Sequence, residues 1–290
     1  MHTSIALTAF RELWIHTGTA CNLSCPFCHE GSRPGDMRIE PVTLAEIAPQ
    51  LDVAATLGVE RFAFTGGEPL ILKDIHAILL HALSLRPALV LTNGTAPLIR
   101  RAHHLASLRA APNALSFRVS IDYPDEARHD AGRGLRNFRK ALDGLRLLHE
   151  AGFATGITRM LEAGEDRRAV ENRFRNLLRR QRLPEDLPIV ALPELGLPQP
   201  DGALVPYTQS PSSPPTSLPT PGCSRSRMLL RRNGSLRIAP CALVDDTPAL
   251  EFETGLAESL KIPARALHAR CAQCLSQGVD YVGIGTQESC

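Results

Sequence analysis

Three cysteines fall within eight residues of the sequence, in the spacing C-x3-C-x2-C of the stretch CNLSCPFC: Cys21, Cys25 and Cys28. Thiolates bind zinc and iron–sulfur clusters, and an odd number of cysteines cannot all pair in disulfides. Three thiolates can hold three irons of a [4Fe–4S] cluster and leave the fourth iron open to an outside ligand. A structural zinc site is the alternative, although such a site normally has four protein ligands.

A second group of cysteines lies nearer the C-terminus, in the order C-x17-C and C-x2-C: Cys223, Cys241, Cys271 and Cys274. Four thiolates complete either a zinc tetrahedron or a fully ligated [4Fe–4S] cluster, and the spacing alone does not choose between them. Between the first two, the stretch RRNGSLRIAPC predicts a β-hairpin that turns at Asn233 and Gly234. The remaining cysteine, Cys290, is expected to be exposed and without a chemical role.

Short apolar runs alternate with helical patterns over the first two-thirds of the chain. The runs predict strands at residues 13–16, 61–66, 88–94, 115–122, 153–160 and 187–193. Residues 43–58 and 138–152 carry apolar side chains at helical spacing, and both segments end in glycine, as helices often do. Repeated strand–helix units predict an α/β fold with a parallel sheet, in which ligands bind at the carboxyl ends of the strands.

Chemically useful side chains follow several of these strands. The cysteine motif follows the first strand, and TGGEP, with Gly66, Gly67 and Glu68, follows the second. Paired glycines let the backbone approach a ligand closely, although an ordinary turn with a solvated or helix-capping Glu68 is the alternative. The next two strands end at Asn93 and Ser120, which are either ligand contacts or simple turn and capping residues.

Two arginines are candidates for binding a carboxylate, because a planar guanidinium can grip a carboxylate with two hydrogen bonds. They are Arg133 in HDAGRG and Arg159 in GITRM, at the end of an expected strand. In a chain this rich in arginine, both can also be surface residues. His29 and Glu30 directly follow the third cysteine and are expected to hydrogen-bond around the metal ligands rather than bind the metal.

The cysteine motif, with Phe27 before its last cysteine, and the TGGEP segment together resemble the radical S-adenosylmethionine (SAM) enzymes. The resemblance implies a partial (β/α)6 barrel and a [4Fe–4S] cluster on the three clustered cysteines. In that family, the open iron chelates SAM, and reductive cleavage of SAM gives a 5′-deoxyadenosyl radical that abstracts a substrate hydrogen. The TGGEP segment hydrogen-bonds the SAM amine there, and positions like Asn93 and Ser120 touch the SAM carboxylate or ribose.

The C-terminal cysteine order resembles the twitch domain, a short SPASM-type extension that carries one auxiliary [4Fe–4S] cluster. It is most similar to the arrangement in the dehydrogenase of 2-deoxy-scyllo-inosamine. The resemblance implies a net two-electron oxidation of a polar small molecule such as an amino sugar, with flavodoxin or a ferredoxin-type protein as electron donor. The domains expected are residues 1–192 for the SAM core, 193–221 for a linker or lid that holds nine of the 23 prolines, and 222–290 for the twitch domain.

Several alternatives remain. The stretch SIDYPDEARHDAGRGLRNF resembles the corresponding segment of SPASM peptide maturases, so a peptide substrate or a redox-neutral epimerisation is the runner-up. The core motifs are also similar to those of GTP 3′,8-cyclases, but those enzymes use three C-terminal cysteines and end in Gly-Gly, whereas this chain has four and ends in GTQESC. A zinc-stabilised binding protein without catalytic activity is the other class.

The charge and hydropathy patterns bound the partners. The formal net charge of +2 gives no strong field for nucleic acid or an anionic membrane surface. No run of about 18 apolar residues is present, and the N-terminal stretch has no signal-peptide pattern. We therefore expect a cytoplasmic protein with neither a nucleic-acid nor a membrane partner.

Overall fold

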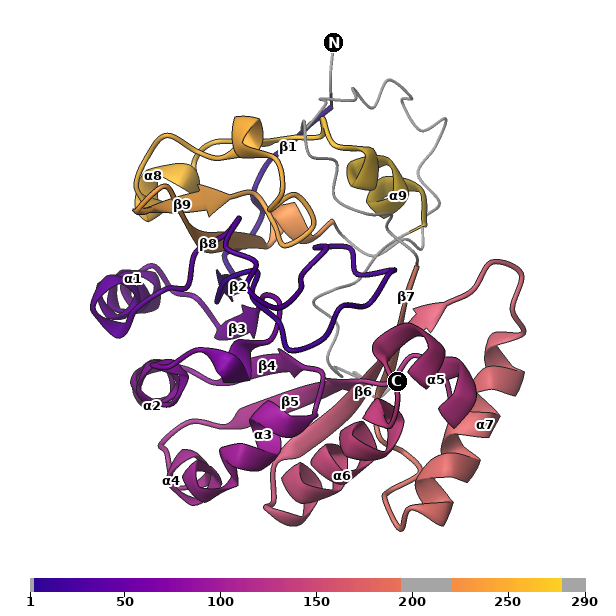
Figure 1. Cartoon of the computed structure of the whole chain (residues 1–290). Coiled ribbons are helices and arrows are strands. Elements are labelled where there is room, and N and C mark those ends of the chain that lie inside the picture. The colour runs from indigo at the N-terminus through magenta and orange to yellow at the C-terminus, as the bar shows by residue number, and fades with distance from the viewer. Residues whose placement is uncertain (1–2, 194–220, 278–290) are drawn as a thin grey trace, which may run out of the picture.

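A twisted sheet of eight strands organises the part of the chain that this computed structural model describes, residues 3–193 and 221–277. The strand order is β7-β6-β5-β4-β3-β2-β8-β9. The first six in sequence run parallel to one another, as predicted (Figure 1): β2 (Glu12–His16), β3 (Arg61–Thr65), β4 (Ala88–Thr92), β5 (Leu115–Ser120), β6 (Ala154–Leu161) and β7 (Ile189–Pro193). The predicted α/β fold with a partial (β/α)6 barrel is therefore confirmed.

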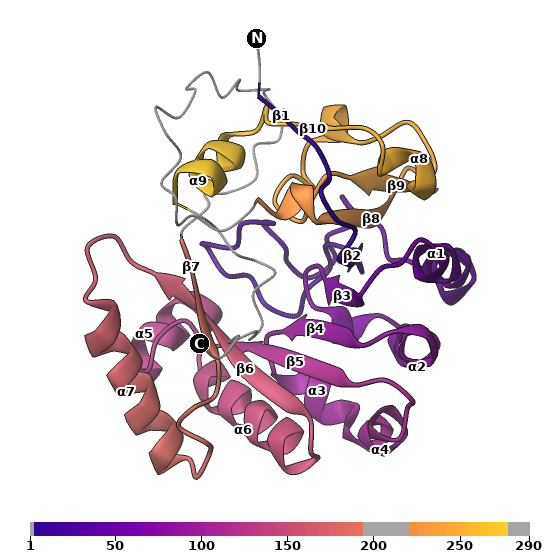
Figure 2. The same ribbon diagram turned by 180° about the vertical axis from the view of Figure 1, so that it is seen from behind.

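Helices cover the outer face of this sheet, as both views show (Figures 1 and 2). They are α1 (Leu44–Thr56), α2 (Ile75–Leu85), α3 (Ala96–Arg100), α4 (Leu105–Arg109), α6 (Asn137–Glu150) and α7 (Arg167–Arg180), with short 3-10 turns η1 (Pro69–Ile71) and η2 (Ala102–His104). Helix α5 (Glu126–Arg133) follows the carboxyl end of β5 and packs against α6. Thr43 and Glu46 form a reciprocal capping box that starts α1. The apolar stripes of α1 and α6 pack against β-branched and aromatic side chains of the strands, which explains the helical spacing found in the sequence.

The C-terminal segment continues the same sheet. Strand β8 (Ser226–Arg232) pairs in parallel with β2, and β9 (Ser235–Ala239) returns antiparallel to β8. Asn233 and Gly234 both have positive φ, at 52° and 72°, so the predicted hairpin turn is confirmed. The other elements are β1 (Ser4–Ile5), η3 (Gly222–Ser224), η4 (Pro248–Leu250), α8 (Leu256–Ser259), β10 (Ala264–Arg265), which pairs with β1, and α9 (Ala269–Gln277).

Some sequence predictions stay untested. Residues 194–220, which make up nearly all of the proline-rich segment, and Cys290 lie outside the described residues. The proposed domain boundaries remain predictions, although β8 joins the C-terminal segment directly to the core through β2. None of the helices in the described part of the chain is long and apolar enough to cross a membrane.

Candidate functional site

The three clustered cysteines lie in the loop between β2 and α1, at the carboxyl edge of the sheet, and their side chains line a cavity. Of the residues predicted for this site, the same cavity is lined by Cys21, Cys25, Cys28, Gly66, Gly67, Asn93, Ser120, Arg133 and Arg159. Burial raises the pKa of the Cys21 thiol to about 12, so this thiol keeps its proton at neutral pH unless a metal displaces it. The strand order thus brings together motifs that are far apart in the sequence.

Gly66 and Gly67 hold the loop after β3 against the cysteine loop. A Cβ on Gly66 would lie 2.7 Å from the carbonyl oxygen of Gly18, and one on Gly67 would lie 2.6 Å from the carbonyl carbon of Ala20. The backbone of Glu68 donates to the Ala20 carbonyl at 3.1 Å. The glycines therefore permit a close approach between two loops of the protein, in addition to forming part of the cavity wall.

Glu68 does not line the cavity, although the sequence placed it among the ligand-binding residues. Its carboxylate accepts hydrogen bonds from Leu70 N at 3.0 Å, Thr92 Oγ1 at 2.8 Å and Asn93 N at 2.7 Å. Burial raises the pKa of this carboxyl, and these hydrogen bonds partly oppose that shift. Its bond from Leu70 N caps η1, as in the helix-capping alternative, and its other two bonds hold the end of β4. The role of Glu68 toward SAM stays a prediction.

Asn93 lies beside the first cysteine and also holds the cysteine loop. Its side-chain Nδ2 donates to Asn22 Oδ1 at 2.9 Å and approaches Cys21 Sγ at 3.8 Å. Its Oδ1 accepts from both the amide and the hydroxyl of Thr95. The side chain is therefore oriented by three neighbours at the cavity wall.

Ser120, Asp122 and Arg133 form the part of the wall that comes from β5 and α5. The Arg133 guanidinium forms a two-bond ion pair with Asp122, with Nε–Oδ2 and Nη2–Oδ1 distances of 2.5 and 3.1 Å. It also lies 5.7 Å from the ring centroid of Phe27, which packs against α5 at Gly132. A carboxylate of the protein, that of Asp122, thus already pairs with Arg133.

Arg159, at the end of β6, likewise pairs with a carboxylate of the protein. Its two terminal nitrogens contact Glu165 at 2.5 and 3.0 Å, and its side chain is only 1% exposed. Its Nε and the hydroxyl of neighbouring Thr158 are buried without a hydrogen-bond partner among the described residues. Both residues line the cavity, so an acceptor bound there would satisfy polar groups that the protein leaves unpaired.

The four C-terminal cysteines meet around a second, smaller cavity beside Trp14. They come from η3, from the segment after β9 and from α9: Cys223, Cys241, Cys271 and Cys274. The rest of the cavity wall is largely apolar, and burial raises the pKa of Cys223 to about 12. The fold therefore collects one set of three and one set of four thiols at separate places.

The spacing of the cysteine sulfurs bears on the choice between zinc and an iron–sulfur cluster that the sequence left open. Thiolates on one tetrahedral zinc ion lie about 3.8 Å apart, given a Zn–S bond of about 2.3 Å. Across residues 3–193 and 221–277, however, no three cysteine sulfurs fall within 4.8 Å of one another. Neither set therefore brings three sulfurs as close together as one tetrahedral zinc ion would hold them in the described part of the chain.

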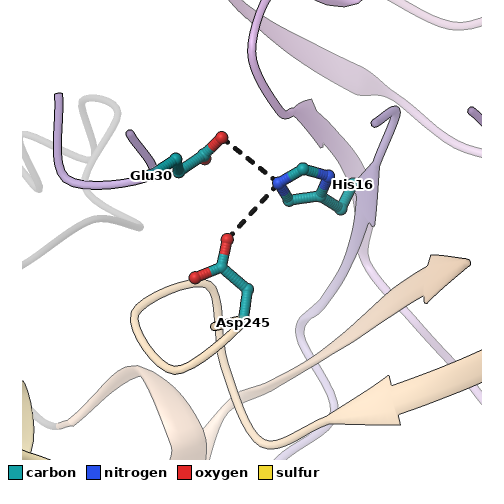
Figure 3. Close-up of side chains that lie close together, drawn as sticks. All are labelled: His16, Glu30 and Asp245. Atoms are coloured by element: carbon teal, nitrogen blue, oxygen red, sulfur yellow. Dashed lines mark hydrogen bonds and ion pairs between the residues drawn. The ribbon is translucent and has the colours of Figure 1, made fainter. Parts of the chain in front are cut away.

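His16, Glu30 and Asp245 form a buried contact between β2, the cysteine loop and the C-terminal segment (Figure 3). His16 Nε2 lies 3.2 Å from Glu30 Oε2 and 3.3 Å from Asp245 Oδ2, and these side chains are between 0% and 4% exposed. Burial by itself lowers the pKa of His16, but Glu30 and Asp245 together outweigh burial and raise this pKa to about 9. Nε2 therefore keeps its proton at neutral pH and directs it toward the carboxylates.

The protonation of His16 indicates that this trio is a hydrogen-bonded contact rather than a cation site. A cation on Nε2 would have to displace the proton that the two carboxylates stabilise there, and the pKa of about 9 keeps the ring protonated at neutral pH. The trio therefore links three segments of the chain, and Glu30 hydrogen-bonds to His16, while its expected role around the metal ligands stays a prediction.

Sequence reasoning missed several residues of these sites. Asp122 sits two residues after Ser120 on the same strand end, a signal that could have identified it. His16, Asp245 and Arg270 had no such signal, because their partners lie in distant segments and become neighbours only when β8 pairs with β2.

Comparisons with known proteins agree with this geometry. Residues 15–176 match the Radical SAM superfamily. A probable GTP 3′,8-cyclase of Methanocella arvoryzae is 34% identical over 149 residues, which cover 51% of this chain and 45% of the relative. A second cyclase, of Mycolicibacterium smegmatis, is 36% identical over 41% of this chain and 33% of its own length. The matches thus span less than half of the length of these curated relatives.

Solved structures show the same fold at low sequence identity. Streptococcus suis SuiB bound to S-adenosylmethionine superposes with a TM-score of 0.62 and 15% identity, over 88% of this chain and 66% of SuiB. The structure of BtrN with AdoMet and 2-DOIA covers 94% of this chain and 89% of BtrN, with a TM-score of 0.42 and 14% identity. The second likeness is too weak to carry an argument.

Proposed function

Because the chain belongs to the radical SAM superfamily, we propose that it is an enzyme whose Cys21, Cys25 and Cys28 hold a [4Fe–4S] cluster and whose cavity binds SAM. When bound, this pair supplies a 5′-deoxyadenosyl radical, which takes a hydrogen atom from the substrate. The observation that carries the proposal is that three thiols line one cavity together with the ends of β3, β4, β5 and β6.

The residues present fit these groups. The cavity has three sulfur ligands, which leaves a fourth cluster position for SAM. The buried, unpaired Arg159 Nε and Thr158 Oγ1 offer hydrogen-bond donors to an anionic group such as the SAM carboxylate. Gly66 and Gly67 line the same cavity and offer backbone without side chains.

The chain's own residues have distinct tasks in this proposal. Gly66 and Gly67 present backbone groups to the SAM amine, and Asn93 orients the loop that carries Cys21. Ser120 and Arg133 contact the SAM ribose or carboxylate, and Arg159 binds the carboxylate. The Asp122 and Glu165 carboxylates hold the two guanidinium groups in place before SAM arrives.

We further propose that Cys223, Cys241, Cys271 and Cys274 hold a second [4Fe–4S] cluster, as in a twitch domain. Their common cavity supports this, and no three of these sulfurs lie within 4.8 Å of one another, as three ligands of one zinc ion would. Such a cluster can accept one electron, which would make the reaction a net two-electron oxidation of a polar small molecule. A flavodoxin or ferredoxin-type protein is the proposed electron donor.

A GTP 3′,8-cyclase is the second candidate, because curated relatives carry that name. Four C-terminal thiols around one cavity disfavour it, since the cyclase resemblance calls for three and an open auxiliary iron. Peptide modification or a redox-neutral epimerisation remains the alternative within the superfamily. Incubating the reduced protein with SAM and GTP, and looking for a cyclised purine product, separates the cyclase from the others.

Metal analysis tests the cluster assignment. Protein purified without oxygen should contain about eight irons and matching sulfide per chain, because two four-iron clusters are proposed. A variant with Cys223→Ala and Cys241→Ala should retain about four. Stoichiometric zinc would contradict both sites, and four irons in the unaltered protein would contradict the auxiliary cluster.

A further inference from the structure

Arg270 connects the two cysteine sites. It directly precedes Cys271, and its Nη2 donates to the carbonyl oxygen of His29, which directly follows Cys28, at 2.6 Å. Its Nη1 donates to the carbonyl oxygen of Leu243 at 3.0 Å, on the segment that begins at Cys241. The residue is 2% exposed, so one buried guanidinium joins peptides that adjoin ligands of both sets.

The surroundings of Arg270 fix its position and partly balance its charge. Nη2 lies 3.3 Å from Asp246 Oδ2, and Asp246 also contacts His268 Nε2 at 3.0 Å. The backbone amide of Arg270 donates to His268 Nδ1 at 3.0 Å. Because these partners already fix the Arg270 side chain, it loses little conformational entropy when it hydrogen-bonds to the His29 carbonyl.

The contact at His16 is a second link between the same two segments. Glu30 follows Cys28 by two residues, Asp245 follows Cys241 by four, and the two carboxylates meet at His16 Nε2. The loop after Cys28 is therefore tied to the C-terminal segment at two successive residues. His29 is bound by Arg270, and Glu30 is linked to Asp245 through His16, the contact drawn in Figure 3.

We propose that Arg270 is a positioning residue that couples the loop after Cys28 to the C-terminal segment. Its hydrogen bonds hold that loop in place for SAM binding, and its charge shifts the reduction potentials of both clusters. This inference rests on the proposed function, since it takes both cysteine sets to bind clusters. Without the guanidinium, the His29 carbonyl loses a charge-assisted hydrogen bond in a buried setting. The loop that presents Cys28 to the cavity then has one fewer restraint.

Charge gives a second, separable consequence. A positive group beside a cluster stabilises the reduced form, which carries one more negative charge, and its field is weakly screened when buried. Arg270 adjoins both cysteine sets, so its removal should make the reduction potential of both clusters more negative. Lysine at this position keeps the charge but lacks the planar fork that reaches His29 and Leu243 together.

Arg227 provides a matched control within the same segment. It is 0% exposed, and its Nη1 donates to the carbonyl oxygen of Cys223 at 2.8 Å, while Nη2 donates to Ser259 O at 3.0 Å. It therefore carries the same buried charge next to an auxiliary ligand, and these hydrogen bonds stay within the C-terminal segment. Its loss should affect the auxiliary cluster alone.

The experiment compares anaerobically purified holoprotein of the unaltered chain with Arg270→Met, Arg270→Lys, Arg227→Met and Arg227→Lys. Electron paramagnetic resonance gives two quantities. A redox titration gives the reduction potential of each cluster, and a SAM titration gives the SAM concentration at which half of the SAM-binding cluster shows the signal of its SAM-bound form. For Arg270→Met we expect about a tenfold increase in that concentration, the equivalent of one lost charged hydrogen bond, and more negative potentials for both clusters. Arg270→Lys should show the weaker SAM response with potentials near those of the unaltered protein.

The Arg227 variants should leave the SAM response and the potential of the SAM-binding cluster unchanged. Equal effects of Arg227→Met and Arg270→Met on the SAM-binding cluster would overturn the proposal, and so would a normal SAM response in Arg270→Met. If the methionine variants do not fold, the same comparison between the lysine variants decides. Zinc or four irons in the unaltered protein would contradict the proposed function instead, whatever Arg270 does.

Discussion

Gly67 and Ala20 lie so close that no side chain fits between them, because a Cβ on Gly67 would be 2.6 Å from the Ala20 carbonyl carbon. Ala20 immediately precedes the first cysteine, so the loop after β3 fixes the start of the cysteine loop. We predict that Gly67→Ala forces the two loops apart and lowers both the iron bound at Cys21, Cys25 and Cys28 and the affinity for SAM. Iron analysis and equilibrium binding of SAM check this.

Gly255→Ala is the control for that substitution. Nothing lies within 4 Å of a Cβ placed on Gly255, and its φ is −67°, which suits any residue. This variant should bind iron and SAM as the unaltered protein does. Normal iron content and SAM affinity in Gly67→Ala would show that the close approach of the loops is unimportant.

His129 should make stability fall as the pH is lowered. Its side chain is buried on α5, its Nδ1 accepts from the Asp122 amide at 3.3 Å, and its Nε2 has no partner in the described part of the chain. Burial, and then the nearby Arg133, lower its pKa from 6.5 to about 4. The unfolded chain takes up a proton near pH 6.5 while the folded protein resists it, so stability is lost as pH falls from about 6.5 toward 4.

The measurement is the unfolding temperature of holoprotein between pH 7 and pH 5, compared between the unaltered chain and His129→Gln. Over this range, we expect the free energy of unfolding to fall by on the order of 1–2 kcal/mol more in the unaltered protein than in the variant, which appears as a larger drop in unfolding temperature. Because both proteins carry the same cysteine sites, the comparison cancels effects of acid on bound clusters. Parallel curves for the two proteins would contradict the assignment of His129 as a buried neutral ring.

Arg159 and Glu165 offer a way to separate folding from SAM binding. Arg159→Met leaves the Glu165 carboxylate, 6% exposed, without its charged partner and should destabilise the protein by about 3 kcal/mol. Adding Glu165→Gln removes the orphaned charge and should recover most of that stability. SAM affinity should stay at least about tenfold weaker in both variants, since both lack the guanidinium proposed to bind the SAM carboxylate.

Thermal unfolding and SAM binding are measured on the same preparations. Recovery of SAM affinity in the double variant would mean that Arg159 acts only through the fold.

The sequence was sufficient for the six parallel core strands and for the edge of the sheet at which the candidate site lies. Strand patterns and the rule that ligands bind at carboxyl ends correctly placed the cysteine loop, Gly66 and Ser120 on one edge, because these depend on local periodicity and parallel pairing. The direction of a side chain was harder to predict. Glu68 turns toward β4 because three donors are arranged there, and a linear motif does not reveal such donors.

Contacts between distant segments were beyond the reach of the sequence alone. His16 meets Asp245, and Arg270 meets His29, only because β8 adds to the sheet beside β2. In the same way, a chain rich in arginine gave no sign that Arg133 would pair with Asp122. Such pairings depend on tertiary register, which neither spacing nor periodicity encodes.

Formation of 5′-deoxyadenosine from SAM is the measurement that tests the central claim most directly. The anaerobic, reduced protein should convert SAM to 5′-deoxyadenosine, whereas Cys25→Ala should not, because two thiolates no longer hold the SAM-binding cluster. Cys290→Ala, which also removes one thiol, should retain the activity. Unchanged 5′-deoxyadenosine formation in Cys25→Ala, or none in the unaltered protein containing about eight irons, would contradict the account.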